Sequence, residues 1–282
     1  MNAPGAERAG PGRLPGSLSL VLPAHNEAGN IEAVVSRALA VLPDYTSDFE
    51  IVVVNDGSRD ETPQIIDRLA AEDARVRTVH HPANQGYGAA LRSGFAVTRG
   101  DHVMFMDADR QFDIADIRLL VPFVEFFDIV AGFRLERNDP LRRRINAEIF
   151  NVAIRLLFGV HLRDIDCAFK IFRGDLLRSL ELTAPGALIN TEIQAKLRRQ
   201  GASLEQVGVH HYPRIAGEAT GGSARVIFRA MGETVLLWLR MHRYQPPASA
   251  TKPRPYHSLG DIVMGTGTAV GAFLLRRLWR RK

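Results

Sequence analysis

The sequence predicts an α/β fold, a doubly wound and mostly parallel sheet with a helical C-terminal extension. Apolar, β-branched runs recur in the first half of the chain at roughly 30-residue spacing, the spacing of βαβ units. Helix-like segments lie between these runs. Short acidic segments follow three of them. In such sheets ligands bind beyond the carboxyl ends of the strands, so we expect one crevice to collect the acidic segments.

The first half of the chain alternates strands and helices. Strands are predicted over Leu18–Leu22, Glu50–Val54, Val76–Val79 and His102–Met106. Helices are predicted over Ala28–Leu42, Thr62–Glu72 and Gly88–Thr98. The first helix has apolar residues at helical spacing, for example Ile31, Val34 and Val35, which indicates one buried face.

The second half is more mixed. Strands are predicted over Asp128–Gly132 and Leu204–His211, and helices over Leu141–Phe158, Asn190–Gln200 and Ala224–Met241. Gly201 ends the second of these helices, as a glycine commonly does. The last helix has a strongly apolar face.

Composition sets the domain boundaries. Residues 1–16 are rich in Gly, Pro and Ala without the apolar core of a signal peptide, which predicts a disordered leader. Residues 17–243 form the predicted folded domain. Residues 244–258 contain four prolines and are predicted to be a linker, followed by a tail over residues 259–282.

The tail favours a membrane surface. Ile262–Leu275 contains no charged residue but is shorter than the roughly 20 residues of a transmembrane helix. Arginines and Trp279 follow it, a combination typical of a cytoplasmic membrane face. We therefore expect a peripheral or tail-anchored protein there. A C-terminal helix docked on the body is the alternative.

Charge and cysteine content narrow the function classes. The 282 residues are 46% hydrophobic and 24% charged, with a net charge of +5, which suits anionic partners such as nucleotide diphosphates or phospholipids. The basic residues lack the aromatic-interleaved pattern of a nucleic-acid surface, so no nucleic-acid partner is expected. The single cysteine, Cys167, allows no intrachain disulfide and fits a reducing compartment, most simply as a buried small side chain.

The acidic pair after the fourth predicted strand is the sharpest chemical signal. Asp107 and Asp109 are two residues apart, so on extended backbone their carboxylates point to the same side. Such a pair suits a hard divalent cation that holds a diphosphate. This indicates an enzyme that uses a nucleotide-activated substrate.

Five segments in order carry a family resemblance: Pro23–Glu27, Asn55–Thr62, Asn84–Ala90, Asp107–Gln111 and Asp164–Lys170. The chain resembles the inverting family 2 glycosyltransferases with the GT-A fold. Within them it is most similar to the branch of dolichol-phosphate mannose synthases and polyprenyl-phosphate hexosyltransferases. The resemblance covers about residues 17–243.

The resemblance implies a donor-nucleotide pocket. Its residues would be Pro23, Ala24, Asn26, Glu27, Asn55, Asp56, Gly86, Asp107 and Ala108. The family usually has Asp where this chain has Asn55, which leaves Asp56 as the carboxylate. Gly86 and Gly88 would let the backbone approach the nucleotide-binding strands closely. The same two glycines also suggest a dinucleotide fingerprint, but Leu91 replaces the third glycine, which disfavours a dehydrogenase.

The resemblance also implies a metal site. Asp107, Asp109 and Gln111 match the family pattern, and their oxygen ligands suit Mg²⁺ or Mn²⁺. Asp109 thereby becomes both a ligand and a catalytic residue.

The acceptor is the open question. A phosphate monoester is already ionised and needs cations rather than a general base. The resemblance implies that Arg134 and Arg143 bind an acceptor phosphate, that Asp166 lies near the reacting centre, and that Arg214 reaches the diphosphate. Asp164 is an alternative to Asp166, and Arg225 to Arg214.

The hypothesis is therefore a metal-dependent transferase that moves a hexose from GDP-mannose, or from UDP-glucose, to a polyprenyl or dolichyl phosphate. A second hypothesis has a hydroxyl acceptor, with Glu192 or Asp166 as the base. A third is a non-catalytic nucleotide-sugar sensor or membrane scaffold, which the intact carboxylate pair disfavours. The oligomeric state stays open.

Overall fold

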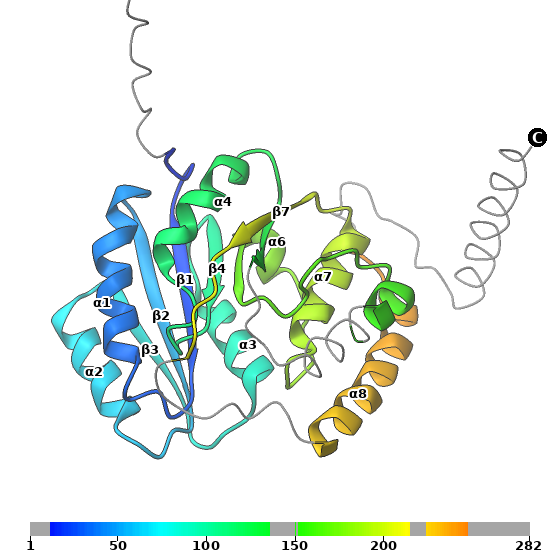
Figure 1. Cartoon of the computed structure of the whole chain (residues 1–282), viewed down its shortest axis with the longest axis horizontal. Coiled ribbons are helices and arrows are strands. Elements are labelled where there is room, and N and C mark those ends of the chain that lie inside the picture. The colour runs from blue at the N-terminus through cyan, green and yellow to red at the C-terminus, as the bar shows by residue number, and fades with distance from the viewer. Residues whose placement is uncertain (1–11, 136–149, 151, 215–223, 248–282) are drawn as a thin grey trace, which may run out of the picture.

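A seven-stranded sheet forms the centre of the computed structural model, which describes residues 12–135, 150, 152–214 and 224–247 (Figure 1). Its strand order is β3-β2-β1-β4-β6-β5-β7. The strands are β1 (Leu18–Ala24), β2 (Phe49–Asp56), β3 (Val76–His81), β4 (His102–Met106), β5 (Ile129–Arg134), β6 (Phe169–Arg173) and β7 (Leu204–Val209).

The predicted doubly wound, mostly parallel sheet is confirmed. Every neighbouring pair is parallel except those of β6, which runs antiparallel to β4 and β5. The sequence did not predict β6. The reason is Lys170, a charged residue at the second position of a five-residue strand whose first four residues are buried.

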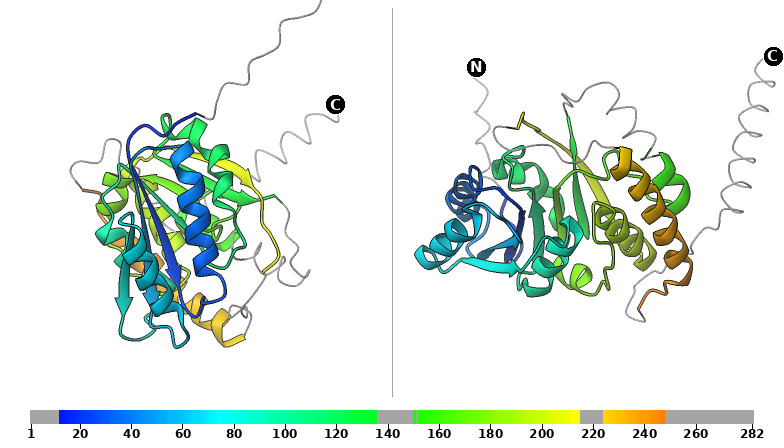
Figure 2. Two further views of the ribbon diagram at one scale, coloured as in Figure 1. Left: turned by 90° about the vertical axis from the view of Figure 1, so that its left-hand side faces the viewer. Right: turned by 90° about the horizontal axis from the view of Figure 1, so that it is seen from below.

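Helices cover both faces of the sheet (Figure 2). On one face lie α1 (Ile31–Val41), α2 (Thr62–Glu72), the 3₁₀ turn η2 (Ile114–Asp116) and α4 (Ile117–Val124). On the other lie α3 (Tyr87–Val97), α6 (Gly174–Arg178), α7 (Ile189–Gln200) and, packed on α7, α8 (Ala224–Arg243). A second 3₁₀ turn, η1 (Leu42–Asp44), follows α1.

Several predicted boundaries move. The first helix begins at Ile31 rather than Ala28, because residues 27–30 form a turn in which Asn30 N donates to Glu27 O at 2.9 Å. β2 continues to Asp56 rather than ending at Val54, so Asn55 and Asp56 belong to the strand. β7 ends at Val209, two residues before the predicted end. Of the helix predicted over 141–158, residues 150 and 152–158 are described and helical.

The packed body begins earlier than predicted. Leu14 is buried, and its backbone N donates to Tyr45 O at 2.9 Å, so the last residues of the predicted leader lie against the domain. The sequence did not predict this contact because Leu14 is the only large apolar residue in a segment rich in Gly and Pro. Residues 1–11 and 248–282, with most of the predicted leader, linker and tail, lie outside the described residues.

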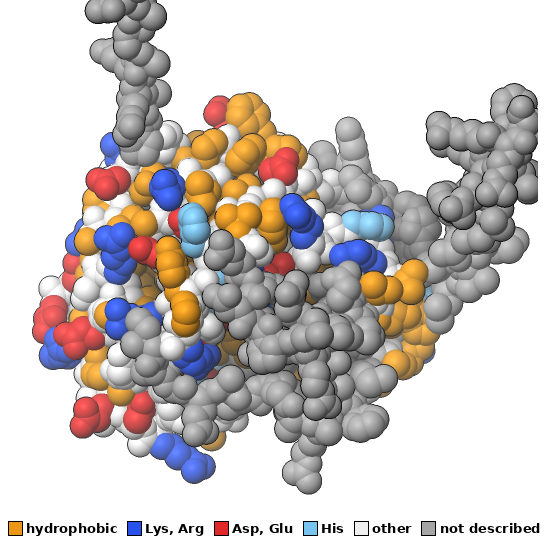
Figure 3. Space-filling model, viewed as in Figure 1, with side chains coloured by type: hydrophobic (Ala, Val, Ile, Leu, Met, Phe, Trp, Pro, Cys, Tyr) orange, Lys and Arg blue, Asp and Glu red, His pale blue; other side chains and the backbone are white. Residues whose placement is uncertain are grey.

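The helix α8 is amphipathic. Leu237 and Met241 are buried, whereas Val235, Leu236 and Leu239 are each more than half exposed. Figure 3 shows hydrophobic side chains gathered over this helix and the nearby helix of residues 152–158. Among the described residues, no helix combines the length and apolar character that a membrane crossing requires.

Candidate active site

The carboxyl ends of β1, β2 and β4 meet at one edge of the sheet because the three strands are parallel, with Ala24 opposite Asn55. Pro23 and Ala24 are the buried last residues of β1. Two hydrogen bonds tie the following loops together. Asn26 N donates to Ser58 Oγ at 3.0 Å, and Arg59 N donates to Asn26 Oδ1 at 2.8 Å. Asn26 has a positive φ of 56°, a conformation that Asn tolerates better than most residues.

Asp56 is anchored inside the protein. Its carboxylate accepts from Gln85 N and Gly86 N, both at 2.8 Å, and bonds to His81 Nδ1 at 2.7 Å. The neighbouring Asn55 accepts from Ser58 N at 2.9 Å through Oδ1. Both side chains are buried, and they hold together the loops at the ends of β2 and β3. His81 was not among the predicted residues, although its position at the end of β3 beside Asp56 in β2 is a usable signal.

Gly86 and Gly88 serve a contact that the sequence did not indicate. The expected close approach was to the nucleotide-binding strands. Instead both glycines face the segment 184–186, and Gly88 N donates to Pro185 O at 2.8 Å. A Cβ on Gly86 would lie 2.6 Å from Pro185 O, and the φ of Gly86 is +98°. These glycines therefore join the donor side of the sheet to the segment before α7.

Three carboxylates gather beyond β1 and β4. Burial, and then the charge of Asp109, raise the pKa of Asp107 to about 7, against an opposing hydrogen bond from the Tyr87 hydroxyl. Burial also raises the pKa of Glu27, which the nearby Asp109 raises further. Ala108, between the two aspartates, is buried. Burial is the larger cause of both shifts, and the repulsion between neighbouring carboxylates adds to it.

Arg214 meets this cluster from the segment after β7. Its Nη2 lies 2.6 Å from Asp109 Oδ2, and its Nη1 lies 3.9 Å from Glu27 Oε1. Gln111 is fixed nearby, since its Nε2 donates to Tyr212 O at 3.3 Å and its backbone O accepts from Tyr212 N at 2.9 Å. The structure thus places Glu27, Asp107, Asp109 and Gln111, all predicted site residues, near one another, with the predicted Arg214 bound to Asp109.

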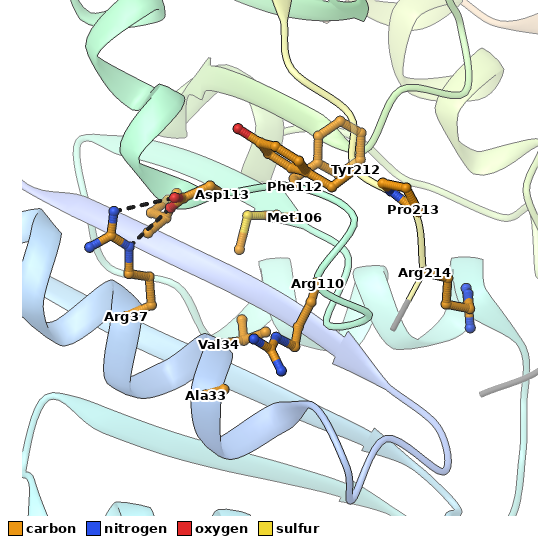
Figure 4. A pocket seen from close by; sticks show the side chains of 11 residues that line it. Ala33, Val34, Arg37, Met106, Arg110, Phe112, Asp113, Tyr212, Pro213 and Arg214 are labelled. Atoms are coloured by element: carbon orange, nitrogen blue, oxygen red, sulfur yellow. Dashed lines mark hydrogen bonds and ion pairs between the residues drawn. The ribbon is translucent and has the colours of Figure 1, made fainter. Parts of the chain in front are cut away.

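A cavity of about 590 Å³ opens beside Arg214 (Figure 4). Its wall is largely apolar, with Val34 from α1, Met106 at the end of β4, and Phe112 and Tyr212 above. Arg37 closes one end by pairing with Asp113 at 3.1 Å. Asp113 also caps η2 by accepting from Ala115 N.

The predicted acceptor side carries a buried ion pair. Arg134, the last residue of β5, binds Asp164 through Nε at 2.6 Å and Nη2 at 2.9 Å. Both side chains are largely buried, at 16% and 6% exposure. These bonds use two of the five guanidinium donors. Arg143, the other predicted phosphate ligand, and Arg225 cannot be placed: Arg143 lies outside the described residues, and the side chain of Arg225 is not described.

Asp166 lies on an exposed turn next to this pair. Burial raises the pKa of Tyr87, and the charges of Asp107 and Asp166 raise it further, so both aspartates lie near Tyr87. Beneath the turn, the fully buried Lys170 donates to Ile165 O at 3.1 Å and to Cys167 O. Burial lowers the pKa of Lys170 and raises that of Cys167 to about 12, so this thiol is a core residue, not a nucleophile.

Glu192 is unsuited to the base role that the hydroxyl-acceptor hypothesis offered it. Its carboxylate binds Lys196 Nζ at 2.8 Å and accepts from Ala184 N at 2.7 Å and Thr183 N at 2.9 Å. Burial by itself would raise its pKa, but these hydrogen bonds outweigh burial and lower it. A buried carboxylate held in its charged form is a structural anchor.

The residues at the acidic cluster fit a hard divalent cation. Asp107, Asp109 and Gln111 offer oxygen ligands, and a cation would stabilise the charged form of Asp107, which burial and then the charge of Asp109 disfavour. Within the described ranges, no three His, Cys, Asp or Glu side chains are arranged to hold a metal by themselves. The protein residues would therefore share such a cation with oxygens of a bound diphosphate.

Comparison with known proteins identifies the family. Residues 19–180 match the model of Glycosyl transferase family 2. The chain is 30% identical over 264 residues to dodecaprenyl-phosphate galacturonate synthase of Rhizobium johnstonii, covering 92% of this chain and 75% of that protein. It is 33% identical over 207 residues to glycosyltransferase AglD of Haloferax volcanii, covering 70% of this chain.

Some relatives are longer. The chain spans 33% of AglD and 64% of the undecaprenyl-phosphate 4-deoxy-4-formamido-L-arabinose transferase of Aeromonas hydrophila, to which it is 27% identical over 212 residues. That second match covers 74% of this chain.

The fold has solved counterparts. Glucosyl-3-phosphoglycerate synthase of Mycobacterium tuberculosis, crystallised with Mn²⁺, uridine diphosphate and glucosyl-3-phosphoglycerate, matches with a TM-score of 0.60. The identity is 24%, over 83% of this chain and 82% of that one. The likeness confirms the predicted GT-A fold. With the strand-end carboxylates in place on this fold and the family model matched over residues 19–180, the chain belongs to glycosyl transferase family 2.

Proposed function

We propose that this protein transfers a hexose from a nucleotide diphosphate sugar to a polyprenyl phosphate at the edge formed by β1, β2 and β4. The convergence of Glu27, Asp107 and Asp109 beside Arg214 carries the proposal, because this cluster suits a cation and a diphosphate together. Relatives named as polyprenyl-phosphate transferases support the acceptor class.

The residues divide the work of the reaction. Asp107, Asp109 and Gln111 would hold Mg²⁺ or Mn²⁺, which stabilises the departing diphosphate when bound. Pro23, Ala24, Asn26 and Asn55 line the loops that would hold the nucleoside, and Asp56 fixes the loop at Gly86 against them. Arg214 would neutralise the diphosphate.

On the acceptor side, an ionised phosphate oxygen attacks the anomeric carbon from the face opposite the diphosphate, so no general base is required. Arg134 would orient that phosphate with the donors that Asp164 does not use. Arg143 is retained as a second candidate ligand. Asp166, near Tyr87 and Asp107, would border the reacting centre.

The donor is a narrower proposal. GDP-mannose is the first candidate and UDP-glucose the second, whereas the relatives are named for galacturonate and an arabinose derivative. A thermal-shift screen with GDP, UDP and their sugars, each with Mg²⁺ or Mn²⁺, separates the guanosine from the uridine class in one measurement.

The transfer experiment tests the function directly. Purified full-length protein is incubated with each nucleotide sugar, a divalent cation and short-chain polyprenyl phosphate, and lipid products are identified by mass spectrometry. We expect a lipid-linked sugar that a chelator abolishes. Hydrolysis without transfer, or transfer only to hydroxyl acceptors, would reject the proposal; the second result would favour Asp166 as a base.

We also propose that the protein acts at the cytoplasmic face of a membrane, held there peripherally or by its tail. Support comes from the exposed apolar residues Val235, Leu236 and Leu239 of α8, with Arg240 and Arg243 in the last turn. The double variant L236D/L239D should float less with anionic liposomes than the native chain, while Gln64→Asp/Ala71→Asp, which adds the same two charges on the exposed face of α2, should not. Equal flotation would contradict the role of α8.

A further inference from the structure

Arg214 already occupies the carboxylate that a metal ion would need. Its Nη2 donates to Asp109 Oδ2 at 2.6 Å, and the other oxygen of Asp109 accepts from Gln111 N at 3.1 Å. The Asp109 side chain is 6% exposed and that of Arg214 is 28% exposed. Both oxygens of Asp109 are thus engaged by protein donors.

A guanidinium and a divalent cation are poorly compatible at this carboxylate. Mg²⁺ binds its oxygen ligands at about 2.0–2.1 Å, which would place it beside the guanidinium group at Asp109 Oδ2. Two cations that close, in a largely buried site, repel each other strongly. Binding of the metal therefore requires Arg214 to leave Asp109.

We propose that Arg214 and the divalent cation exchange at Asp109, so that Arg214 keeps the metal site paired in the absence of substrate. The exchange rests on the proposed function, because it takes Asp109 as a metal ligand. Arg214 is charge-paired in the resting protein and again when metal and donor are both bound. Its partner is Asp109 in the first state and the donor diphosphate in the second.

The charge balance of the cluster implies that metal and nucleotide bind cooperatively. Arg214 is bonded to Asp109 at 2.6 Å and lies 3.9 Å from Glu27, and its positive charge also acts on Asp107. Metal alone would leave Arg214 without its carboxylate, and nucleotide alone would bring a diphosphate to an acidic cluster. Metal and nucleotide together satisfy every group, so each should strengthen the binding of the other.

Titration of full-length protein with Mn²⁺ alone tests the exchange, using calorimetry or the electron paramagnetic resonance signal of free Mn²⁺. The Arg214→Met variant should bind Mn²⁺ at least about tenfold more tightly than the native chain, because no charge-assisted hydrogen bond must first be broken. In the presence of Mn²⁺ the same variant should bind GDP or UDP more weakly than the native chain. This opposite pair of shifts is the signature of exchange.

Arg110→Met is the matched control. Arg110 follows Asp109 in the chain and lines the same cavity as Arg214 (Figure 4), so its loss removes the same charge from the same surface. We expect its Mn²⁺ affinity to stay within about twofold of native, since exposed charges are strongly screened. Circular dichroism melts verify that both variants fold.

The outcomes separate the two proposals. If the native chain binds Mn²⁺ and transfers sugar while Arg214→Met leaves Mn²⁺ affinity unchanged, the exchange is wrong and the proposed function stands. Equal tightening by Arg110→Met would also overturn the exchange, because a general field effect would explain it. If no variant binds Mn²⁺ with or without nucleotide, the metal assignment and the exchange both fail.

Discussion

The proposed donor side of the sheet edge, at the ends of β1 and β4, and the proposed acceptor side, at the end of β5, differ in how their charges are paired. Beyond β1 and β4, Arg214 is bonded to Asp109 and lies near Glu27, and the pKa values of Asp107 and Glu27 are raised. Beyond β5 and β6, Arg134 is paired with Asp164, and the buried Lys170 is bound to backbone carbonyls. Further along, Glu192 is held by Lys196.

The difference distinguishes charges that are available to bind a ligand from charges that stabilise the fold. An unbalanced cluster costs folding free energy, and it persists where a ligand later supplies the missing charge. Internally paired charges fix the backbone instead, as the Asp164–Arg134 pair fixes the end of β5 against the turn at 164–167. Four predictions test this contrast, in decreasing order of expected effect.

Neutralising the donor-side pair should have the largest effect. The Asp107→Asn/Asp109→Asn variant should lose at least about 1,000-fold in sugar transfer, because the charge that stabilises the leaving diphosphate is no longer held. The single variant Asp107→Asn, which keeps the Asp109–Arg214 pair, should not lower the free energy of unfolding without metal, since it removes the repulsion between Asp107 and Asp109. Turnover assays and urea denaturation check both; unchanged turnover would end the metal interpretation.

Breaking the acceptor-side pair should mainly reduce stability. Asp164→Asn leaves the guanidinium of Arg134 buried without its counter-charge, at a cost of roughly 3–5 kcal/mol in unfolding free energy. The double variant with Arg134→Gln should recover part of that loss in a double-mutant cycle. Arg68→Gln, which breaks exposed pairs with Glu32 and Glu72, should cost less than about 1 kcal/mol. Equal losses at the two sites would remove the contrast.

The donor side should also respond to pH. The folded pKa of Asp107, about 7, exceeds its unfolded value of about 3.9, so the folded state binds more protons between these limits. Without metal, stability should fall relative to Asp107→Asn as pH rises from about 4 to about 7, and then level off. Denaturation with a chelator across this range measures the difference; parallel curves would contradict the raised pKa.

Glu192 should give the smallest change in turnover. Glu192→Gln retains a side chain of the same size, and the geometry assigns Glu192 no contact with the reacting centre, so transfer should stay within about twofold of native. Stability should fall because Lys196 loses its charged partner. A large loss of transfer with intact stability would restore Glu192 as a base.

Much of the donor side was predictable. Parallel strands with roughly 30-residue spacing must bring their carboxyl ends to one edge, and this alone brought Asn26, Asn55, Asp107 and Asp109 together. The i, i+2 spacing of the aspartates was likewise a local property of the backbone. These inferences needed no contact between distant side chains.

The acceptor side was less predictable because its organisation depends on a strand that the apolar pattern conceals. Lys170 interrupts β6, and β6 places the 164–167 turn beside Arg134. The role of Gly86 and Gly88 was misassigned for a similar reason. Their neighbour, Pro185, is about a hundred residues away in sequence, and nothing local predicts that contact.

By itself the sequence determined the fold class, the family and the edge of the sheet at which the carboxylates gather, because hydrophobic period and motif order are local properties of the chain. Only the tertiary structure decided which charged side chains are already paired within the protein. Arg214 on Asp109, Arg134 on Asp164 and Lys196 on Glu192 are pairings whose strength depends on burial and on distances of a few ångströms. Burial and distance arise only when the whole chain has folded.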